Sequence, residues 1–267
     1  MEQIGANVPP IKVYPDKFAG QVVMVTGAAQ GIGEVTARLF AAQGASVVLV
    51  DLNKEKLQEV SSKIESQGEK ATSRVCDVGV EAEVDSLINE VASTLGKIDV
   101  LVHLAGIYPF KPILDCTVAD YRRIFNVNVD SCFFLTRAVL PHMQRAGYGR
   151  IINTASATIQ VPEPGLSVYA ASKRAVAGFT RSIAVEAGPG VTANIVSPSL
   201  IRTDNTWNSG VSADGSHPLF EKILGRQCVK RHGLPKDVAH VISFIASPEA
   251  EFITGQLFNV GGGASFH

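Results

Sequence analysis

The stretch QVVMVTGAAQGIG, residues 21–33, decides the fold class of this chain. It opens with an apolar, β-branched run that ends in Gly27, which is typical of a buried strand in a parallel sheet. The residues that follow have a helical apolar pattern that includes Leu39 and Phe40, and Gly44 ends it. A strand, a glycine-rich turn and a helix in this order begin a strand–helix–strand unit of an α/β protein.

Strand-sized apolar runs and helical patterns alternate along the rest of the chain. Strict alternation predicts a single doubly wound parallel sheet with helices on both faces, the Rossmann architecture. The sequence contains no Gly/Ser-rich or Pro-rich linker, so we expect an arm at 1–16, one domain at 17–267 and a lid at about 202–230. Strands are predicted at 45–51, 71–78, 98–106, 149–156, 191–198 and 256–260, and helices at 52–68, 82–96, 118–146, from about 168, and at 235–246.

Three glycines follow the first predicted strand in the spacing Gly-x-x-x-Gly-x-Gly, at Gly27, Gly31 and Gly33. Glycine allows a tight turn and lets the backbone approach a ligand without a Cβ in the way. The first N–H groups of the next helix, together with the positive end of its dipole, can bind phosphate. We therefore expect a dinucleotide pyrophosphate here, although glycines that serve only the turn would give the same pattern.

Two acidic positions lie at the ends of the next two predicted strands. Asp51 lies about 20 residues beyond the glycines, where a carboxylate binds the adenosine ribose and repels a 2′-phosphate. The first basic residue after it is Lys54, so the sequence favours NAD over NADP as the cofactor. Asp77 and Val78 are placed to contact the adenine edge. Either Asp could instead be the N-cap of the following helix.

Residues 156–173, SATIQVPEPGLSVYAASK, contain a hydroxyl at Ser156, a phenol at Tyr169 and an ammonium at Lys173. Tyr169 and Lys173 are four residues apart, so on a helix they share one face. A nearby cation lowers the pKa of a phenol from its usual value of about 10, which makes proton exchange with an alcohol or carbonyl oxygen feasible. An ordinary amphipathic helix with a packed Tyr and a solvated Lys would look the same.

Composition and charge exclude several other classes of protein. Hydrophobic residues make up 46% of the chain, charged residues 18%, and the formal net charge is −1. This balance argues against a nucleic-acid-binding surface and a polybasic membrane surface. No apolar run reaches the about 20 residues of a membrane span, and the first 16 residues do not resemble a secretory signal. We expect a cytoplasmic protein.

The cysteines and histidines do not form a ligand pattern. The six histidines are scattered, and the four cysteines have no C-x-x-C spacing. We therefore expect buried, reduced thiols and no metal site. The cysteines are Cys76, Cys116, Cys132 and Cys228.

The order and spacing of the motifs resemble the short-chain dehydrogenase/reductase family. The resemblance runs from about Gly20 to the C-terminus and implies an NAD(P)-dependent oxidoreductase that acts on CH–OH groups. Four segments, at 105–112, 126–136, 151–158 and 197–203, are most similar to bacterial alcohol dehydrogenases of the (S)-1-phenylethanol dehydrogenase type. The matching motifs are Thr26-Gly27-x-x-x-Gly31-Ile32-Gly33, Asp51, Asp77-Val78, Asn128, Ser156 and Tyr169-x-x-x-Lys173.

The resemblance implies a role for each matching residue. Tyr169 would be the general acid/base, Lys173 would lower its pKa and hold the nicotinamide ribose, and Ser156 would orient the substrate oxygen. Asn128, which the family's spacing favours over Asn126, would hold a water that relays protons toward Lys173. The cofactor would contact Gly27, Gln30, Gly31, Ile32, Gly33, Asp51, Leu52, Asp77, Val78, Tyr169, Lys173, Ile201 and Thr203.

The chain departs from the family pattern outside the proton-transfer set. His103-Leu104 replaces the family's Asn-Asn at the fourth strand, and His103 either donates in place of an amide or is a satisfied core histidine. Ser199 replaces a Gly, and Asn259 replaces an Asp near the C-terminus. We expect these changes to affect cofactor affinity rather than activity.

The residues expected around the substrate are mostly apolar or aromatic, which favours a medium-sized hydrophobic or aryl secondary alcohol. A sugar, polyol or cis-diol is the close alternative, and a non-catalytic dinucleotide-binding protein is the remote one. Gly, Ser and Asn near Trp207 suggest a mobile lid, but Trp207 and Phe220 could equally pack this segment onto the domain. The predicted substrate residues are Tyr108, Ser156, Thr158 and Trp207, with Ile107, Phe110 and residues up to Pro162 beside them.

Two helices have more apolar surface than a single domain requires. Phe133 and Phe134 on the helix predicted at 118–146, and Phe179 on the Tyr169 helix, widen the apolar stripe beyond one face. We therefore expect a homo-oligomer, and the family resemblance implies a tetramer.

Overall fold

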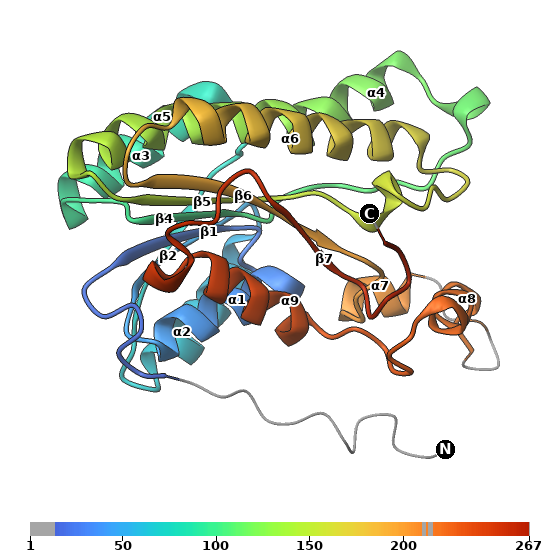
Figure 1. The fold of residues 1–267 in the computed structure, drawn as a ribbon, viewed down its shortest axis with the longest axis horizontal. Helices are drawn as coiled ribbons and strands as arrows, with labels where there is room; N and C mark the ends of the chain where they lie inside the picture. The colour runs from blue at the N-terminus through green and yellow to red at the C-terminus, as the bar shows by residue number, and fades with distance from the viewer. Residues whose placement is uncertain (1–13, 210–211, 213–215, 267) are drawn as a thin grey trace.

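A parallel sheet runs through the centre of the molecule (Figure 1). The computed structural model describes residues 14–209, 212 and 216–266, and within them the sheet has seven strands in the order β3-β2-β1-β4-β5-β6-β7. This order reverses direction between β1 and β4, as in a Rossmann fold, and confirms the predicted fold class. The strands are β1 Val22–Thr26, β2 Ser46–Asp51, β3 Lys70–Val75, β4 Val100–His103, β5 Gly149–Thr154, β6 Val191–Pro198 and β7 Leu257–Val260.

Helices cover both faces of the sheet (Figure 1). One face carries α1 (Gly31–Ala42), α2 (Lys54–Glu65) and α9 (Pro235–Ile245). The other face carries α3 (Glu81–Leu95), α4 (Val118–Phe125), α5 (Ser131–Ala146) and α6 (Ser167–Glu186).

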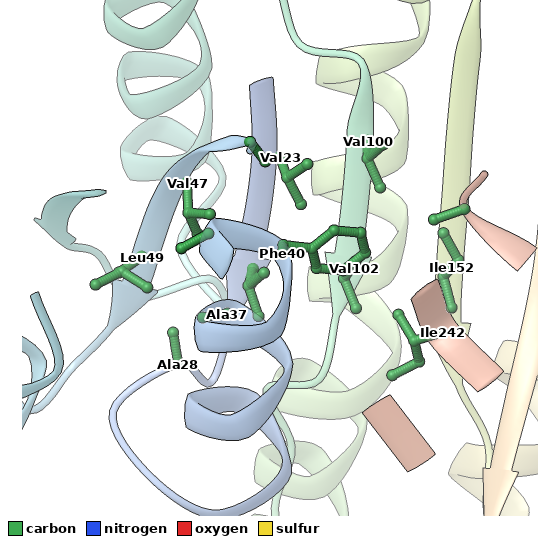
Figure 2. Packing of buried hydrophobic residues seen from close by; sticks show 14 of the residues in the cluster. Val23, Ala28, Ala37, Phe40, Val47, Leu49, Val100, Val102, Ile152 and Ile242 are labelled. Atoms are coloured by element: carbon green, nitrogen blue, oxygen red, sulfur yellow. The ribbon is translucent and has the colours of Figure 1, made fainter. Parts of the chain in front are cut away.

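The core consists of two apolar layers because alternate residues of a strand point to opposite faces. On the first face, Val23 of β1 packs with Phe40 of α1 and Ile242 of α9 (Figure 2). On the second face, Met24 packs with Leu135 of α5. These side chains are buried, and each contributes about 1.5–3 kcal/mol by leaving water. The two layers hold the strand ends, where the site residues lie, in fixed positions.

The helix predicted at 118–146 is interrupted by a π-helical turn over Asn126–Asp130. Within this turn, the Asn128 side chain accepts from the Ile107 N–H at 2.8 Å and donates to the Ile107 carbonyl at 2.9 Å. The wider turn thus accompanies an amide that is bound to the backbone of the segment that follows β4. Sequence periodicity did not predict it, because the partner is distant in the chain.

The loop-rich region predicted at 202–230 contains two short helices, α7 (Asp204–Asn208) and α8 (Pro218–Arg226). Thr203 caps α7 by accepting from the Thr206 N–H, and Pro218 occupies the first turn of α8. These capping signals were present in the sequence, but each helix is too short for a clear apolar period. Residues 1–13 of the predicted arm, 210–211 and 213–215 of the predicted lid, and residue 267 lie outside the described residues.

The described residues include no helix that is both long and apolar enough to cross a membrane.

Candidate active site

A cleft of about 1010 Å³ lies at the carboxyl ends of the strands, where doubly wound sheets bind their ligands. Residues that follow several different strands form its walls. The structure thus brings together segments that are far apart in the sequence. Of the predicted site residues, these line the cleft: Gly27, Gln30, Gly31, Ile32, Gly33, Asp51, Leu52, Asp77, Val78, Tyr108, Ser156, Thr158, Tyr169, Lys173, Ile201 and Thr203.

The turn between β1 and α1 has glycine at three positions where a larger residue would be strained or would clash. Gly27 and Gly31 have φ angles of 69° and 60°, in the left-handed region that favours glycine. A Cβ on Gly33 would lie 1.9 Å from the carbonyl oxygen of Gly27. Gln30, the N-cap of α1, makes no side-chain hydrogen bond to the helix N–H groups. These groups suit a pyrophosphate, so the turn fits a dinucleotide cofactor.

The Asp51 carboxylate fastens the end of β2 to the glycine turn. One oxygen accepts from the Ala29 N–H at 3.1 Å and the other from the Asn53 N–H at 3.0 Å. Asn53 is the N-cap of α2, so the alternative that Asp51 caps this helix is wrong. Each carboxylate oxygen has a further lone pair for a ribose hydroxyl. Leu52 is 63% exposed beside it.

Lys56 is a basic residue near the glycine turn that the sequence analysis missed. Its Nζ donates to Oε1 of Gln30 at 2.8 Å, and both side chains line the cleft. The linear sequence gave Lys54 as the first basic residue after Asp51, but α2 carries Lys56 back toward the turn. Lys56 is three residues after the N-cap Asn53, in the first turn of α2. This helical spacing is the sequence signal that could have indicated that Lys56 lies near the glycine turn.

Asp77 and Val78 lie just beyond β3, which ends at Val75 and is shorter than predicted. The Asp77 carboxylate accepts from the Gly79 N–H at 2.9 Å and closes a turn. Val80, and not Asp77, is the N-cap of α3, so the capping alternative is wrong here as well.

Ser156, Tyr169 and Lys173 meet at the other end of the cleft. Ser156 lies two residues beyond β5, where its Oγ accepts from the Thr158 N–H at 3.3 Å. Tyr169 is in the first turn of α6, and Lys173 is one turn further along. The Lys173 Nζ donates to the Thr154 carbonyl at 2.9 Å and lies 5.9 Å from the centre of the Tyr169 ring.

The pKa values at this end differ from the sequence expectation. Burial raises the pKa of Tyr169 to about 12, and the hydrogen bond with Ser156 only partly opposes this. Burial also lowers the pKa of Lys173 to about 8. The net shift is upward because desolvation of the phenol outweighs the effects that lower its pKa, and the action of Lys173 on Tyr169 stays a prediction. Tyr169 therefore carries its proton at neutral pH.

Asn128 is buried behind the cleft and does not line it. Besides its two bonds to Ile107, its Nδ2 donates to Oγ of Ser172 at 3.0 Å. A Cβ on Gly106 would lie 3.1 Å from Oδ1 of Asn128 and 3.3 Å from Nζ of Lys173, so both side chains adjoin the same glycine. Asn126 instead donates to the Gly79 carbonyl at 2.9 Å, on the side of α3.

His103 is a satisfied core histidine. Its ring nitrogens lie 2.8 Å from Oγ1 of Thr26 and 2.9 Å from Oγ of Ser131. Burial, followed by the charge of Lys173, lowers the pKa of His103 to about 3. The ring is therefore neutral at physiological pH and joins β1, β4 and α5.

Tyr108 and Asn205 form part of the substrate end of the cleft. The rings of Tyr108 and Tyr169 meet edge to face, with their centres 6.2 Å apart. The Tyr108 hydroxyl accepts from Nδ2 of Asn205 in α7 at 2.7 Å. Several apolar residues complete this end: Ile107, Phe110, Val161, Leu166, Leu200, Leu219 and Ile223.

Trp207 lies outside the cleft, contrary to its prediction as a substrate residue. Its ring packs 5.3 Å from Phe220 and 5.4 Å from His217, and the Arg202 guanidinium lies 3.9 Å from its centre. The apolar surface of Trp207 thus fastens α7 to α8. These partners all belong to the same loop-rich region, so the contacts join parts of this region to one another, whereas the alternative placed Trp207 and Phe220 against the rest of the domain.

Glu163 joins the loop after β5 to α8, a contact that the sequence analysis did not predict. Its carboxylate oxygens lie 2.6 Å from Nζ of Lys222 and 3.2 Å from Nη1 of Arg226. The Glu163 side chain is only 11% exposed. No sequence pattern indicates this pair of contacts, because about sixty residues separate the partners.

The cysteines are unpaired, as expected, but their exposure varies. Cys76 and Cys132 are buried, Cys116 is half-buried, and Cys228 is exposed, which corrects the expectation of four buried thiols. Cys228 lies two residues beyond the end of α8. In the part of the chain that the structure describes, no group of three or more His, Cys, Asp or Glu residues could hold a metal ion.

A cleft with a phosphate-binding turn at one end and a phenol, a hydroxyl and an ammonium at the other defines a dinucleotide-dependent oxidoreductase. The chain belongs to the short-chain dehydrogenase/reductase family: residues 27–265 match the family model described as enoyl-(acyl carrier protein) reductase. It is an enzyme that acts on CH–OH groups with a nicotinamide cofactor.

Curated relatives and solved structures agree with this family. The chain is 37% identical over 252 residues to meso-2,3-butanediol dehydrogenase of Serratia marcescens, covering 93% of this chain and 96% of the relative. It is 34% identical over 251 residues to hydroxynaphthalene reductase arp2 of Aspergillus fumigatus, covering 91% of each. A structure of 7α-hydroxysteroid dehydrogenase with NADH and 7-oxo glycochenodeoxycholic acid has a TM-score of 0.87 at 34% identity, over 93% of this chain and 96% of that chain.

Proposed function

We propose that this protein is an NAD-dependent dehydrogenase that interconverts a medium-sized hydrophobic or aryl secondary alcohol and the corresponding ketone. The observation that carries the proposal is the joint position of Ser156, Tyr169 and Lys173 on the wall of the cleft that also contains the glycine turn and Asp51.

Tyr169 acts as the general acid/base in this proposal. Since burial raises its pKa to about 12, the phenol holds a proton that it can give to a ketone oxygen during reduction. Alcohol oxidation needs the phenolate form: Tyr169 first loses its proton, and the phenolate oxygen then receives the hydroxyl proton of the alcohol. The Ser156 hydroxyl orients the reacting oxygen, and NAD, when bound, supplies the hydride acceptor.

Lys173 and Asn128 connect Tyr169 with the interior behind the cleft. Lys173 is buried and fixed by the Thr154 carbonyl, in a position to bind the nicotinamide ribose. Asn128, which adjoins the same Gly106 backbone, positions a water for proton exchange toward Lys173. Ile201 and Thr203, which line the cleft, would hold the nicotinamide amide.

Asp51 supports NAD as the preferred cofactor. Its carboxylate is already fixed by two backbone N–H groups, so it cannot move away from a 2′-phosphate without losing both bonds. Lys56 is the one nearby group noted above that would favour NADP, but its ammonium is already bound to Gln30. Titration of the wild-type protein with NADH and NADPH, followed by cofactor fluorescence, tests this preference directly. We expect tighter binding of NADH, and tighter binding of NADPH would overturn the preference.

The apolar wall around Tyr108 supports a hydrophobic substrate. Ile107, Phe110 and Leu166 would exclude water from the reacting carbon, which strengthens the polar contacts of its oxygen. Arg226 also lines this end, and the Glu163 carboxylate, which pairs with both Lys222 and Arg226, offsets one of these two positive charges.

A screen of NADH formation over aryl alcohols, aliphatic alcohols, diols and sugars tests the proposed function. We expect the highest kcat/KM for secondary alcohols with an apolar or aryl substituent. Preference for sugars or polyols would favour the alternative substrate class. Cofactor binding without turnover of any alcohol would favour a non-catalytic dinucleotide-binding protein.

A further inference from the structure

The hydrogen bond between Tyr108 and Asn205 lies beside the reacting end of the cleft. Tyr108 follows β4 and Asn205 belongs to α7, and both residues line the cleft. Their side chains meet at 2.7 Å, while the Tyr108 ring packs edge to face against the Tyr169 ring. A polar pair is thus held next to the proposed acid/base, beside the apolar residues of this end of the cleft.

Each member of the pair has hydrogen-bonding capacity left. A phenol oxygen that accepts from an amide still has its own O–H to donate, and an amide that donates through its nitrogen still has a carbonyl acceptor. Among the hydrogen bonds of the described residues, none uses the Tyr108 hydrogen or Oδ1 of Asn205. Burial raises the pKa of Tyr108, so its hydroxyl remains a donor at neutral pH.

One donor and one acceptor side by side match a hydroxyl group, which needs both. We propose that Tyr108 and Asn205 form a subsite for a second oxygen of the substrate, on the carbon next to the reacting carbon. The preferred substrates would then be vicinal diols or α-hydroxyketones with an apolar remainder. This inference rests on the proposed function and narrows its substrate class.

If the hydrogen bond only joined the loop after β4 to α7, its effect on different substrates would differ from that of a subsite. The tie would help every substrate equally, because it would act through the shape of the cleft. A subsite discriminates, because a substrate without the second oxygen leaves the pair partly unsatisfied. The ratio of kcat/KM values for two matched substrates separates the two roles.

The test compares 1-phenyl-1,2-ethanediol with 1-phenylethanol, which differ by one hydroxyl group. We expect the wild-type kcat/KM to be about tenfold higher for the diol, as one or two net hydrogen bonds would give. Tyr108→Phe and Asn205→Ala should each reduce this ratio about threefold or more, even if they also slow both reactions. The controls are Tyr121→Phe on α4 and Asn208→Ala on α7, which do not line the cleft and should leave the ratio unchanged.

The outcomes separate this inference from the proposed function. The subsite is refuted, and the proposed function stands, if the wild-type kcat/KM is the same for 1-phenylethanol and for the diol. The same conclusion holds if both variants lower kcat/KM equally for the two substrates. If neither compound nor any other hydrophobic secondary alcohol is oxidised, the proposed function itself fails.

Discussion

Tyr169 is a weak acid in this structure because the protein surrounds it with little water. Burial raises its pKa to about 12, while Ser156 lowers it and the neighbouring Tyr108 raises it further. The sequence motif alone predicts the opposite direction, since the ammonium of Lys173 is one turn away. Lys173 is itself buried and bound to the Thr154 carbonyl, so spacing on a helix did not determine the electrostatics.

This pKa predicts different pH profiles for the two directions of the reaction. Oxidation needs the phenol oxygen without its proton, so its rate should rise with pH from 6 to 10, by up to about tenfold per unit. Reduction uses the protonated phenol and should change little between pH 6 and 8. Initial rates in both directions, with circular dichroism to verify the fold at each pH, give the profiles. Oxidation that is slower at pH 10 than at pH 7 in folded protein would contradict this explanation.

His103 should make the fold sensitive to acid. Its folded pKa of about 3 lies below the unfolded value of about 6.5, so the unfolded chain binds the extra proton between these values. The stability that His103 contributes is present above pH 6.5 and is lost as pH falls toward 3, by up to about 1.4 kcal/mol per pH unit. Thermal unfolding from pH 7 to 4 should therefore show a steeper loss of Tm for wild type than for His103→Asn. If Tm fell equally with pH in wild type and in His103→Asn, this histidine would not be the cause of the loss of stability in acid.

Among the elements, α8 depends on a contact with another part of the chain. Glu163 holds Lys222 and Arg226 with a carboxylate that is largely shielded from water, although both cations are exposed. Such partly exposed pairs contribute about 1 kcal/mol in total. This is a small free energy for the fold but a large one for a nine-residue helix at the mouth of the cleft.

Glu163→Gln should loosen α8 without unfolding the domain. We expect backbone amides of residues 218–226 to exchange hydrogen about fivefold faster, the equivalent of about 1 kcal/mol of local opening. Hydrogen–deuterium exchange with mass spectrometry measures this, with α6 as the internal reference. Glu221→Gln, on the exposed surface of the same helix, is the matched control. Unchanged exchange in Glu163→Gln would show that packing around Trp207 alone holds the helix.

The elements also show where sequence reasoning succeeds and where it fails. The strands and the turn before α1 follow from local patterns. A buried parallel strand requires a run of apolar, β-branched residues, and a left-handed backbone conformation favours glycine. The π-turn at Asn128 and the Glu163 contacts depend on partners that are distant in the sequence. The spacing of apolar residues within one segment cannot predict such contacts. Asp51 and Asp77 looked like helix caps because Asp suits caps, but Asn53 and Val80 occupy those positions.

For the whole molecule, exposed apolar surface on α5 and α6 supports the predicted oligomer. Phe133 is 44% exposed and packs with Phe179 of α6 at a ring distance of 6.2 Å. Val185 near the end of α6 is 86% exposed. We propose that these helices pair between subunits of a homotetramer.

Light scattering at micromolar concentration should give a mass about four times the 28.3 kDa of one chain. Phe133→Lys places a charge on the α5–α6 surface, so it should shift the mass toward smaller species while circular dichroism stays unchanged. Phe252→Lys, at a fully exposed position outside these helices, is the control. A wild-type protein with the mass of one chain would refute the tetramer.

The cytoplasmic location remains a prediction from the sequence. So does the effect of Asn259, whose Oδ1 is buried and has no hydrogen-bond partner among the described residues. Cofactor titration of Asn259→Asp, the family's residue at this position, would measure that effect directly.

The central claim is that Tyr169 transfers the proton in a reaction of a bound nicotinamide cofactor. Single-turnover measurement of NADH formation by wild type and Tyr169→Phe, at saturating alcohol, tests it most directly. We predict a loss of about 10²-fold or more in the rate, because only the phenol hydroxyl is removed, with the Kd for NADH unchanged within a few-fold. A Tyr169→Phe enzyme that binds NADH normally and reacts within a few-fold of the wild-type rate would contradict the claim.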